Sequence, residues 1–317
     1  MARMNGRVQL SSGAFLVLAL ALPLNGQELS KKGKNADINA IGHRNITKDL
    51  NIYSLDQERK LGEQLSKEVE HTSHLLSDPE INSYLDRVTQ NLAHNSDSRF
   101  PITVHLIQAD PPEGFALPGG RIYVDSGLIL SVENESQLAG VIANLIARVA
   151  LRQATRNATK GVLLQIASDP ALAFLPYGWA GYGIYEGMNL SVPLELHKLK
   201  RQQDLEADYF GLQYLYKAGY DPSPYLEFAS KNFEEVYAKQ HLSQSLSQFP
   251  DPKMRIAAMK EEMIKILPSR SSAIVNTSEF DIARKHLAQL VRSLPNPAPT
   301  EPKPTLRRTA DAPTSNP

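Results

Sequence analysis

Hydrophobic residues recur at helical spacing between Leu55 and Gln90, in two separate rows. These positions are Leu61, Leu65, Val69, Ile81, Leu85 and Val88. Residues three or four apart share one face of a helix, so each row predicts an amphipathic helix. Between the rows lies Ser77-Asp78-Pro79, in which Asp is a good helix N-cap and Pro fits the first helical turn. The pattern therefore predicts two helices at the start of a domain.

Two short segments that follow have the character of β-strands. Residues Pro101–Ile107 alternate apolar and polar side chains, and Arg121–Val124 is a short β-rich run behind the turn Pro118-Gly119-Gly120. Because the surrounding pattern is helical, these strands predict a small sheet within a mainly helical protein.

The segment Asn134–Gln153 carries the clearest helical pattern in the chain. One apolar stripe contains Leu138, Val141, Ile142, Leu145 and Val149, and Asn134 with Gln137 forms a capping-box pattern at its start. On a helical wheel, Asn144 and Arg148 share one flank of this stripe. Further helices are predicted at Glu195–Ala218, Tyr225–Gln240, Pro252–Ile266 and Ser278–Ser293, and Gly219 ends the first of these. We expect an α+β fold with one main body.

The two ends of the chain differ in composition from this body. Arg3 and Arg7 precede a short apolar run, which predicts a signal peptide at residues 1–26, with an uncleaved membrane anchor as the alternative. Residues 27–50 are expected to be a flexible linker, residues 51–293 the domain, and the Pro-rich residues 294–317 a disordered tail. Residues 171–188, rich in Gly and aromatic residues, are predicted to be a mobile connection.

Charge and cysteine content restrict the classes of function. Lys plus Arg and Asp plus Glu both number 34, so no overall field attracts nucleic acid, and no nucleic-acid partner is expected. The chain contains no Cys and therefore no disulfides. The predicted signal peptide indicates a periplasmic or secreted protein, without a transmembrane span once the signal is removed.

Several ordered motifs then indicate a family. Residues 114–128, followed by a capped helix, resemble the bacterial zinc metallopeptidases related to HtpX and the CAAX prenyl proteases, and most of all their periplasmic beta-barrel-assembly-enhancing branch. The resemblance covers about Tyr53–Glu262. It includes Tyr53–Glu58, Ala207–Gly211, Lys217–Pro222 and Asp251–Ile256.

The resemblance implies a zincin-like body with the sheet beside an active-site cleft, and a helix carrying His-Glu-x-x-His. In that motif two His residues one turn apart bind zinc and the Glu acts on the zinc-bound water. This sequence reads Asn144-Leu145-Ile146-Ala147-Arg148 in the same register. Leu145 thus stands at the general-base position, and Asn144 and Arg148 stand at the two His positions.

Other family positions have changed as well. The third ligand of the family is a Glu, and Asp204 stands in its place, with Asp208 of the Ala-Asp motif one turn later. A site His of the family is replaced by Phe249. We therefore expect a vestigial site that has lost the ancestral zinc, holds no cofactor and has no catalytic residue. Its members are Asn144, Leu145, Arg148, Asp204, Asp208 and Phe249.

This interpretation makes two structural predictions. Arg148 cannot lose its charge, so we expect its guanidinium to occupy the approximate place of the metal and to form a salt bridge, bidentate if geometry allows, with Asp204 or Asp208, with Asn144 hydrogen-bonded nearby. Leu145 extends the apolar stripe and should be buried. The alternative is an active zinc metalloendopeptidase with non-standard ligands, and a paralogue without a selected role also remains open.

Two pairs of titratable residues allow other interpretations of the chemistry of this chain. Asp204 and Asp208, at i and i+4, could form a carboxylate pair for acid–base chemistry or a site for a hard cation. His71 and His74 could share a helix face, although a solvated pair is the simpler interpretation.

The expected function follows from what survives these changes. The family resemblance implies that an edge strand holds peptide by β-augmentation, which needs backbone groups and no metal. We assign this strand to Phe115, Ala116, Gly119 and Gly120. The predicted function is that of an inactive peptidase homologue that binds or scaffolds unfolded or envelope proteins in envelope quality control.

Overall fold

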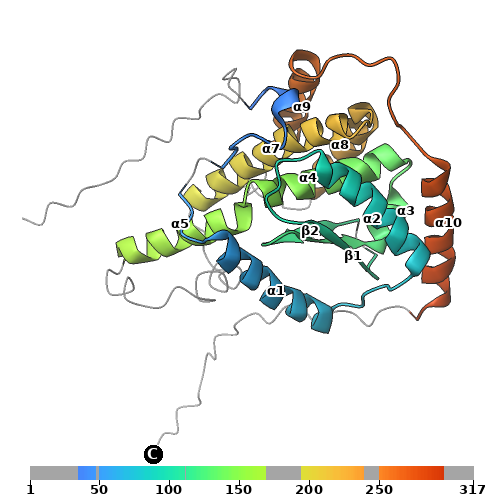
Figure 1. The fold of residues 1–317 in the computed structure, drawn as a ribbon, viewed down its shortest axis with the longest axis horizontal. Helices are drawn as coiled ribbons and strands as arrows, with labels where there is room; N and C mark the ends of the chain where they lie inside the picture. Colours follow the sequence, from blue (N-terminus) through green and yellow to red (C-terminus); the bar gives the residue numbers. More distant parts are fainter. Residues whose placement is uncertain (1–34, 48–49, 111, 169–193, 239–249, 296–317) are drawn as a thin grey trace, which may run out of the picture. The chain divides into compact units, whose positions relative to one another are not determined.

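The computed structural model describes residues 35–47, 50–110, 112–168, 194–238 and 250–295, and these form a mainly helical body around a small sheet (Figure 1). The expected α+β class is confirmed. The predicted signal peptide, the connection at 171–188, Phe249 and all but the first two residues of the predicted tail lie outside the described residues.

Apart from α3 and α5, which were not predicted, the helices follow the predicted pattern closely. They are α1 (Leu55–Thr72), α2 (Pro79–His94), α3 (Ser126–Ser131), α4 (Glu135–Ala150), α5 (Gln153–Ser168), α7 (Leu194–Lys217), α8 (Pro222–Ala238), α9 (Pro252–Lys265) and α10 (Ser278–Ser293). The Asp78 side chain accepts hydrogen bonds from the backbone N–H groups of Glu80 and Ile81, and the Asn134 side chain accepts from Gln137. The predicted N-caps are therefore confirmed.

Helix α5 was not predicted, because its buried face is polar. Thr155, Arg156 and Thr159 are buried on this helix, where an amphipathic pattern would place apolar residues. Thr155 Oγ1 donates a hydrogen bond of 2.9 Å to Glu58 Oε2, and the Thr159 hydroxyl accepts one of 3.2 Å from the Ile52 backbone. Helix α5 is thus held against α1 and the segment before it by hydrogen bonds, where an amphipathic helix would use apolar packing.

The sheet has three strands in the order β1–β3–β2, with bounds β1 (Thr103–Ile107), β2 (Gly114–Leu117) and β3 (Arg121–Asp125). Strand β3 is parallel to β1 and antiparallel to β2. Gly119 and Gly120 have φ values of +79° and +101° and lie in the turn between β2 and β3. Our assignment of these two glycines to the edge strand was therefore wrong: positive φ suits the turn and not the strand.

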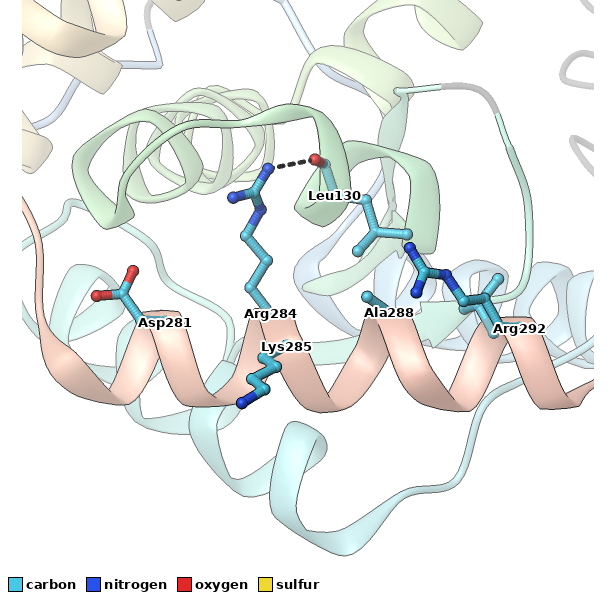
Figure 2. Close-up of a pocket in the computed structure, with 7 residues that line it drawn as sticks. Leu130, Asp281, Arg284, Lys285, Ala288 and Arg292 are labelled. Carbon is cyan, nitrogen blue, oxygen red and sulfur yellow. Dashed lines mark hydrogen bonds between the residues drawn. The ribbon is translucent and has the colours of Figure 1, made fainter.

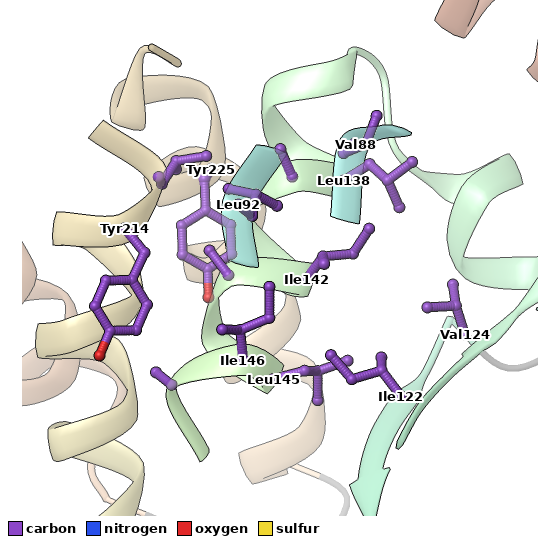
Figure 3. Close-up of a cluster of buried hydrophobic side chains, with 14 of the residues drawn as sticks. Val88, Leu92, Ile122, Val124, Leu138, Ile142, Leu145, Ile146, Tyr214 and Tyr225 are labelled. Carbon is purple, nitrogen blue, oxygen red and sulfur yellow. The ribbon is translucent and has the colours of Figure 1, made fainter. Parts of the chain in front are cut away.

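Helix α4 lies at the centre of the core. It packs against α2, α7, α8 and two strands of the sheet, and Figure 3 shows Leu145, Ile146 and Ile142 among side chains from these elements. Ile122 and Val124 of β3 face this core, whereas Tyr123 faces α1 on the other side of the sheet. Because β3 is covered on both faces, its three central side chains are buried and largely apolar.

Two glycines allow helices to approach α4 closely. A Cβ atom on Gly211 of α7 would lie 3.0 Å from the Asn144 Cα atom, and one on Gly140 would lie 2.1 Å from the ring of Tyr225 on α8. Any side chain at Gly211 would therefore push α7 away from α4. This contact sets the separation of the two helices that carry the candidate site.

The described part of the predicted linker is packed against the domain, which corrects the expected domain start at residue 51. Ile41 and Ile46 are buried in the main core. The Arg44 and Asp97 side chains are 2% and 1% exposed and form an ion pair of 2.6 Å. Arg44 Nη1 also donates to Gln213 Oε1 of α7. The packed body thus includes residues before α1.

Within the described residues, every helix is too short or too polar to cross a bilayer.

The buried Arg44–Asp97 pair gives the first testable prediction. Replacing Arg44 with Ala leaves Asp97 charged and buried, so the free energy of unfolding should fall by about 3–5 kcal/mol. Arg59→Ala is the matched control, because Arg59 pairs with Asp56 at the surface, where both side chains are more than half exposed. The control should cost less than about 1 kcal/mol. Urea denaturation followed by circular dichroism measures both, and equal losses would contradict a tethering role for Arg44.

Candidate functional site

Helices α4 and α7 present two pairs of polar side chains to each other. Asn144 and Arg148 are one turn apart on α4, and Asp204 and Asp208 are one turn apart on α7. Residues at i and i+4 share a helix face, so both pairs point into the same contact. The structure thus brings together the four polar members of the predicted site.

Arg148 forms the expected salt bridge. Its Nη2 atom lies 2.8 Å from Asp204 Oδ1, and its Nε donates a 3.0 Å hydrogen bond to Asn144 Oδ1. The pair is not bidentate, because Asp204 Oδ2 is buried and has no hydrogen-bond partner among the described residues. The Asp204 side chain is 4% exposed and that of Arg148 is 30% exposed. The Arg148 side chain therefore lies between the Asp204 carboxylate and the solvent.

Asp208 is held by a second arginine, which the sequence analysis did not predict. Arg255 of α9 binds both carboxylate oxygens: Nη2 lies 2.9 Å from Oδ1, and Nε donates a short hydrogen bond to Oδ2. Asn144 Nδ2 donates a further bond of 2.8 Å to Oδ1. The Arg255 guanidinium also stacks on the Phe233 ring of α8, 3.5 Å from its centroid. This geometry is the fork-shaped pairing that arginine favours.

A signal for Arg255 was present in the sequence. It belongs to the Asp251–Ile256 motif, which we treated as scaffold. Two carboxylates in one desolvated site need two cations, and Arg148 supplies only one. Counting the charges of the predicted site would have indicated a second basic residue, but it would not have identified that residue.

The four charged groups form a balanced cluster of two Arg and two Asp. Burial raises the pKa of the Asp208 carboxyl, and the Arg255 guanidinium opposes that shift. Asn144 connects the two ion pairs, because its amide donates to Asp208 and its carbonyl accepts from Arg148. The cluster is therefore one continuous hydrogen-bonded network across α4, α7 and α9.

Leu145 is buried, as expected, with 5% of its surface exposed. A Cβ atom on Gly114 of β2 would lie 3.1 Å from Leu145 Cδ1, so this side chain packs against the first residue of the edge strand. Figure 3 shows Leu145 directed toward the sheet. An apolar side chain here can neither bind a water molecule nor transfer a proton.

A third buried ion pair flanks the site. Arg152 Nε lies 2.6 Å from Glu58 Oε2, and Arg152 Nη2 donates to the Tyr53 carbonyl. Arg152 has a φ of +53°, a conformation that non-glycine residues seldom adopt. Gln153, one residue on, donates to the Gln203 carbonyl of α7 at 2.8 Å. These contacts attach α1 and α7 to the end of α4.

The donor atoms of the cluster do not fit a zinc ion. Asp204 Oδ1 and both Asp208 oxygens accept hydrogen bonds from guanidinium groups, and Asn144 is a poor zinc ligand. Within the described ranges, no group of three or more His, Cys, Asp or Glu residues is placed to hold a metal ion. His71 and His74, considered above as a pair, are both exposed on or just after α1.

Strand β2 is an edge strand, as predicted for Phe115 and Ala116. The Asp125 N–H donates to the Glu113 carbonyl, so these two residues form a hydrogen-bonded pair. Hydrogen-bonded and non-hydrogen-bonded pairs alternate along an antiparallel ladder, so Gly114 and Ala116 belong to non-hydrogen-bonded pairs. The backbone groups of Gly114 and Ala116 therefore point away from β3. Among the described residues, no strand pairs with this outer edge. Phe115 stacks on Tyr123 with ring centroids 5.0 Å apart and is 38% exposed.

Comparison with known proteins agrees with this architecture. The model of peptidase family M48 matches residues 79–263. The chain is 25% identical over 237 residues to the beta-barrel assembly-enhancing protease of Escherichia coli (strain K12), covering 73% of this chain and 48% of that protein. It is 28% identical over 221 residues to the mitochondrial metalloendopeptidase OMA1 of Schizosaccharomyces pombe, covering 67% and 63%. The chain thus spans about half the length of the bacterial relative.

The network predicts unequal effects of its two arginines on stability. Arg255→Ala should lower the free energy of unfolding by about 3–5 kcal/mol, because Asp208 would remain buried without its bidentate partner. Arg148→Ala should cost less, about 1–3 kcal/mol, because water can reach Asp204 once the partly exposed guanidinium is removed.

The control for both variants is Arg87→Ala, since Arg87 and Glu279 form an ion pair with both side chains more than half exposed. It should cost less than about 1 kcal/mol in urea denaturation. In a double-mutant cycle, Asp208→Ala should recover part of the loss caused by Arg255→Ala. An Arg148→Ala loss no greater than the control would contradict the structural role of that salt bridge.

Proposed function

Because the chain belongs to peptidase family M48, we propose that it is a catalytically inactive member that binds peptide segments of other proteins. The observation that carries this proposal is the Arg148–Asp204 salt bridge of 2.8 Å. It places a permanent cation on the carboxylate that stands at the third zinc-ligand position of the family. A zinc ion bound to this carboxylate would lie close to the Arg148 guanidinium, and the two cations would repel each other strongly.

The general-base position supports the same proposal. Leu145 stands where the family has its Glu, and it is buried against Gly114. Loss of a general base alone typically reduces the rate by about a hundred- to ten-thousand-fold. Loss of the metal also removes the activated water that attacks the peptide bond. Both changes together remove the two groups on which the hydrolysis of the family depends.

Peptide binding does not need the lost groups. The outward N–H and C=O groups of Gly114 and Ala116 can pair with an extended peptide, and Phe115 provides an exposed apolar contact beside them. Main-chain hydrogen bonds of this kind give affinity without a metal or a catalytic base. The edge strand is therefore the surface that we assign to binding.

The biological setting is inferred from the relatives. The E. coli relative carries the name beta-barrel assembly-enhancing protease, which ties that protein to the assembly of barrel proteins. By analogy, we assign this chain to protein quality control in the cell envelope, in the periplasm or outside the cell, with unfolded or envelope proteins as partners.

Metal content tests the loss of catalysis. Purified full-length protein, dialysed with zinc and then freed of excess metal, should contain far less than one zinc per chain by plasma mass spectrometry and should not cleave casein. Zinc at one per chain that disappears in Asp204→Ala would instead establish an active enzyme with non-standard ligands.

A triple variant serves as the positive control for this measurement. Asn144→His, Leu145→Glu and Arg148→His together restore the family motif, and the His side chains provide two zinc ligands beside Asp204. This variant should bind more zinc than the natural chain, while casein cleavage stays absent because Phe249 still replaces a further site His. Failure to bind any zinc while folded would show that the surrounding residues no longer support the site.

A single backbone change tests peptide binding. Ala116→Pro removes an outward N–H from β2 and leaves the ladder to β3 intact, which an edge strand tolerates. It should weaken binding of fluorescently labelled, reduced and carboxymethylated α-lactalbumin by about tenfold in anisotropy titrations.

The control for this change is Ala116→Ser, which keeps the N–H and should bind as the natural chain does. Equal affinity of the Pro variant, or no binding by the natural chain, would contradict the edge-strand assignment.

A further inference from the structure

A hollow of about 560 Å³ lies between α3 and α10, on elements that carry no residue of the candidate site. Leu130 of α3 lines one side, and Ala288 of α10 lies on the other (Figure 2). Val291 of α10 adds to the apolar lining. The hollow is therefore a trough along a helix, with an apolar interior.

Basic side chains of α10 line this trough. Arg284, Lys285 and Arg292 line it, and the ion pairs among the described residues leave all three without a carboxylate partner. Arg284 Nη2 donates to the Leu130 carbonyl at 2.9 Å, which fixes the guanidinium at the wall of the trough, and its buried Nε has no described partner. The one acidic residue of the lining, Asp281, accepts hydrogen bonds from Asn276 Nδ2. An occupant with negative charge would complement the trough.

The spacing of the cations restricts the kind of occupant. Arg284 and Arg292 are eight residues apart on α10, which corresponds to about 12 Å along a helix axis. A single phosphate or carboxylate cannot contact both. A helix with two acidic residues two turns apart and apolar residues between them presents its groups at about this spacing.

We infer that the trough between α3 and α10 binds an acidic amphipathic helix of another protein. The apolar face of such a helix would lie on Leu130, Ala288 and Val291, and its acidic residues would pair with Arg284 and Arg292. A flat bilayer surface fits less well, because the apolar residues line a concave surface and do not project from it. This is the helix-in-groove mode of recognition with charge complementarity at both ends.

The residues that follow α10 in the chain do not match this chemistry. Residues 296–317 contain Glu301 and Asp311 but also Lys303, Arg307 and Arg308. Their acidic residues are outnumbered by basic ones, so this segment has no excess of negative charge for the trough. Charge complementarity therefore favours an occupant from a second protein over this segment.

The test uses the full chain and a fluorescein-labelled, alanine-based helical peptide with Glu at positions i and i+7 and Leu at i+3 and i+4. A peptide with Lys in place of Glu is the charge control. Anisotropy should show binding of the Glu peptide and not of the Lys peptide. Lys285→Glu/Arg292→Glu should weaken binding at least about tenfold, and Ala288→Leu should weaken it by filling the trough.

The matched control variant is Lys253→Glu/Lys260→Glu, which changes the net charge equally on the exposed side of α9. It should bind the Glu peptide as the natural chain does. Equal weakening by both double variants would show non-specific attraction and overturn the inference. So would no binding of the Glu peptide to the natural chain, or binding to phosphatidylglycerol vesicles that only the α10 variant abolishes.

Discussion

The close crossing of α4 and α7 is the contact on which the candidate site depends. Gly211 has no side chain, so the backbone of α7 can approach the backbone of α4 closely at Asn144: a Cβ atom on Gly211 would lie 3.0 Å from the Asn144 Cα atom. At this separation Asp204 and Asp208 are buried against α4. Two buried, ionised carboxylates without partners would cost several kcal/mol each, by order of magnitude, so keeping them ionised requires cations at this position. A metal ion is one solution, and arginine side chains are another.

In this chain two arginine side chains supply the cations, and together they join more helices than one ion pair would. Arg148 comes from α4 and Arg255 from α9, and both reach carboxylates on α7. The Arg255 guanidinium also rests on Phe233 of α8, so four helices meet around two carboxylates. Because each guanidinium donates along fixed directions, the network is specific in geometry as well as in charge. In our proposal the former catalytic centre has thus become part of the structural core.

Catalysis and peptide binding have separable physical requirements in this fold. Hydrolysis needs a metal with an open position and a base beside it, and both depend on side chains of α4 and α7. Strand addition needs only the outward backbone groups of β2, which the β2–β3 turn and α1 hold in place: a Cβ on Gly62 of α1 would lie 1.8 Å from the Pro118 carbonyl oxygen. In our proposal, Asn144, Leu145 and Arg148 thus account for the loss of hydrolysis, while strand addition depends on the backbone of β2.

The sequence alone determined the features that depend on local order. Helical periodicity and the caps at Asp78 and Asn134 fixed most helices, because these signals lie within one or two turns. The permanent charge of Arg148, together with the family resemblance that places Asp204 and Asp208 opposite it, predicted a carboxylate partner. Tertiary structure decided what depends on distant residues. Asp97 meets Arg44, 53 residues away, only when the N-terminal segment packs. The polar inner face of α5 and the second cation of the site likewise follow from contacts between distant helices, which no local pattern records.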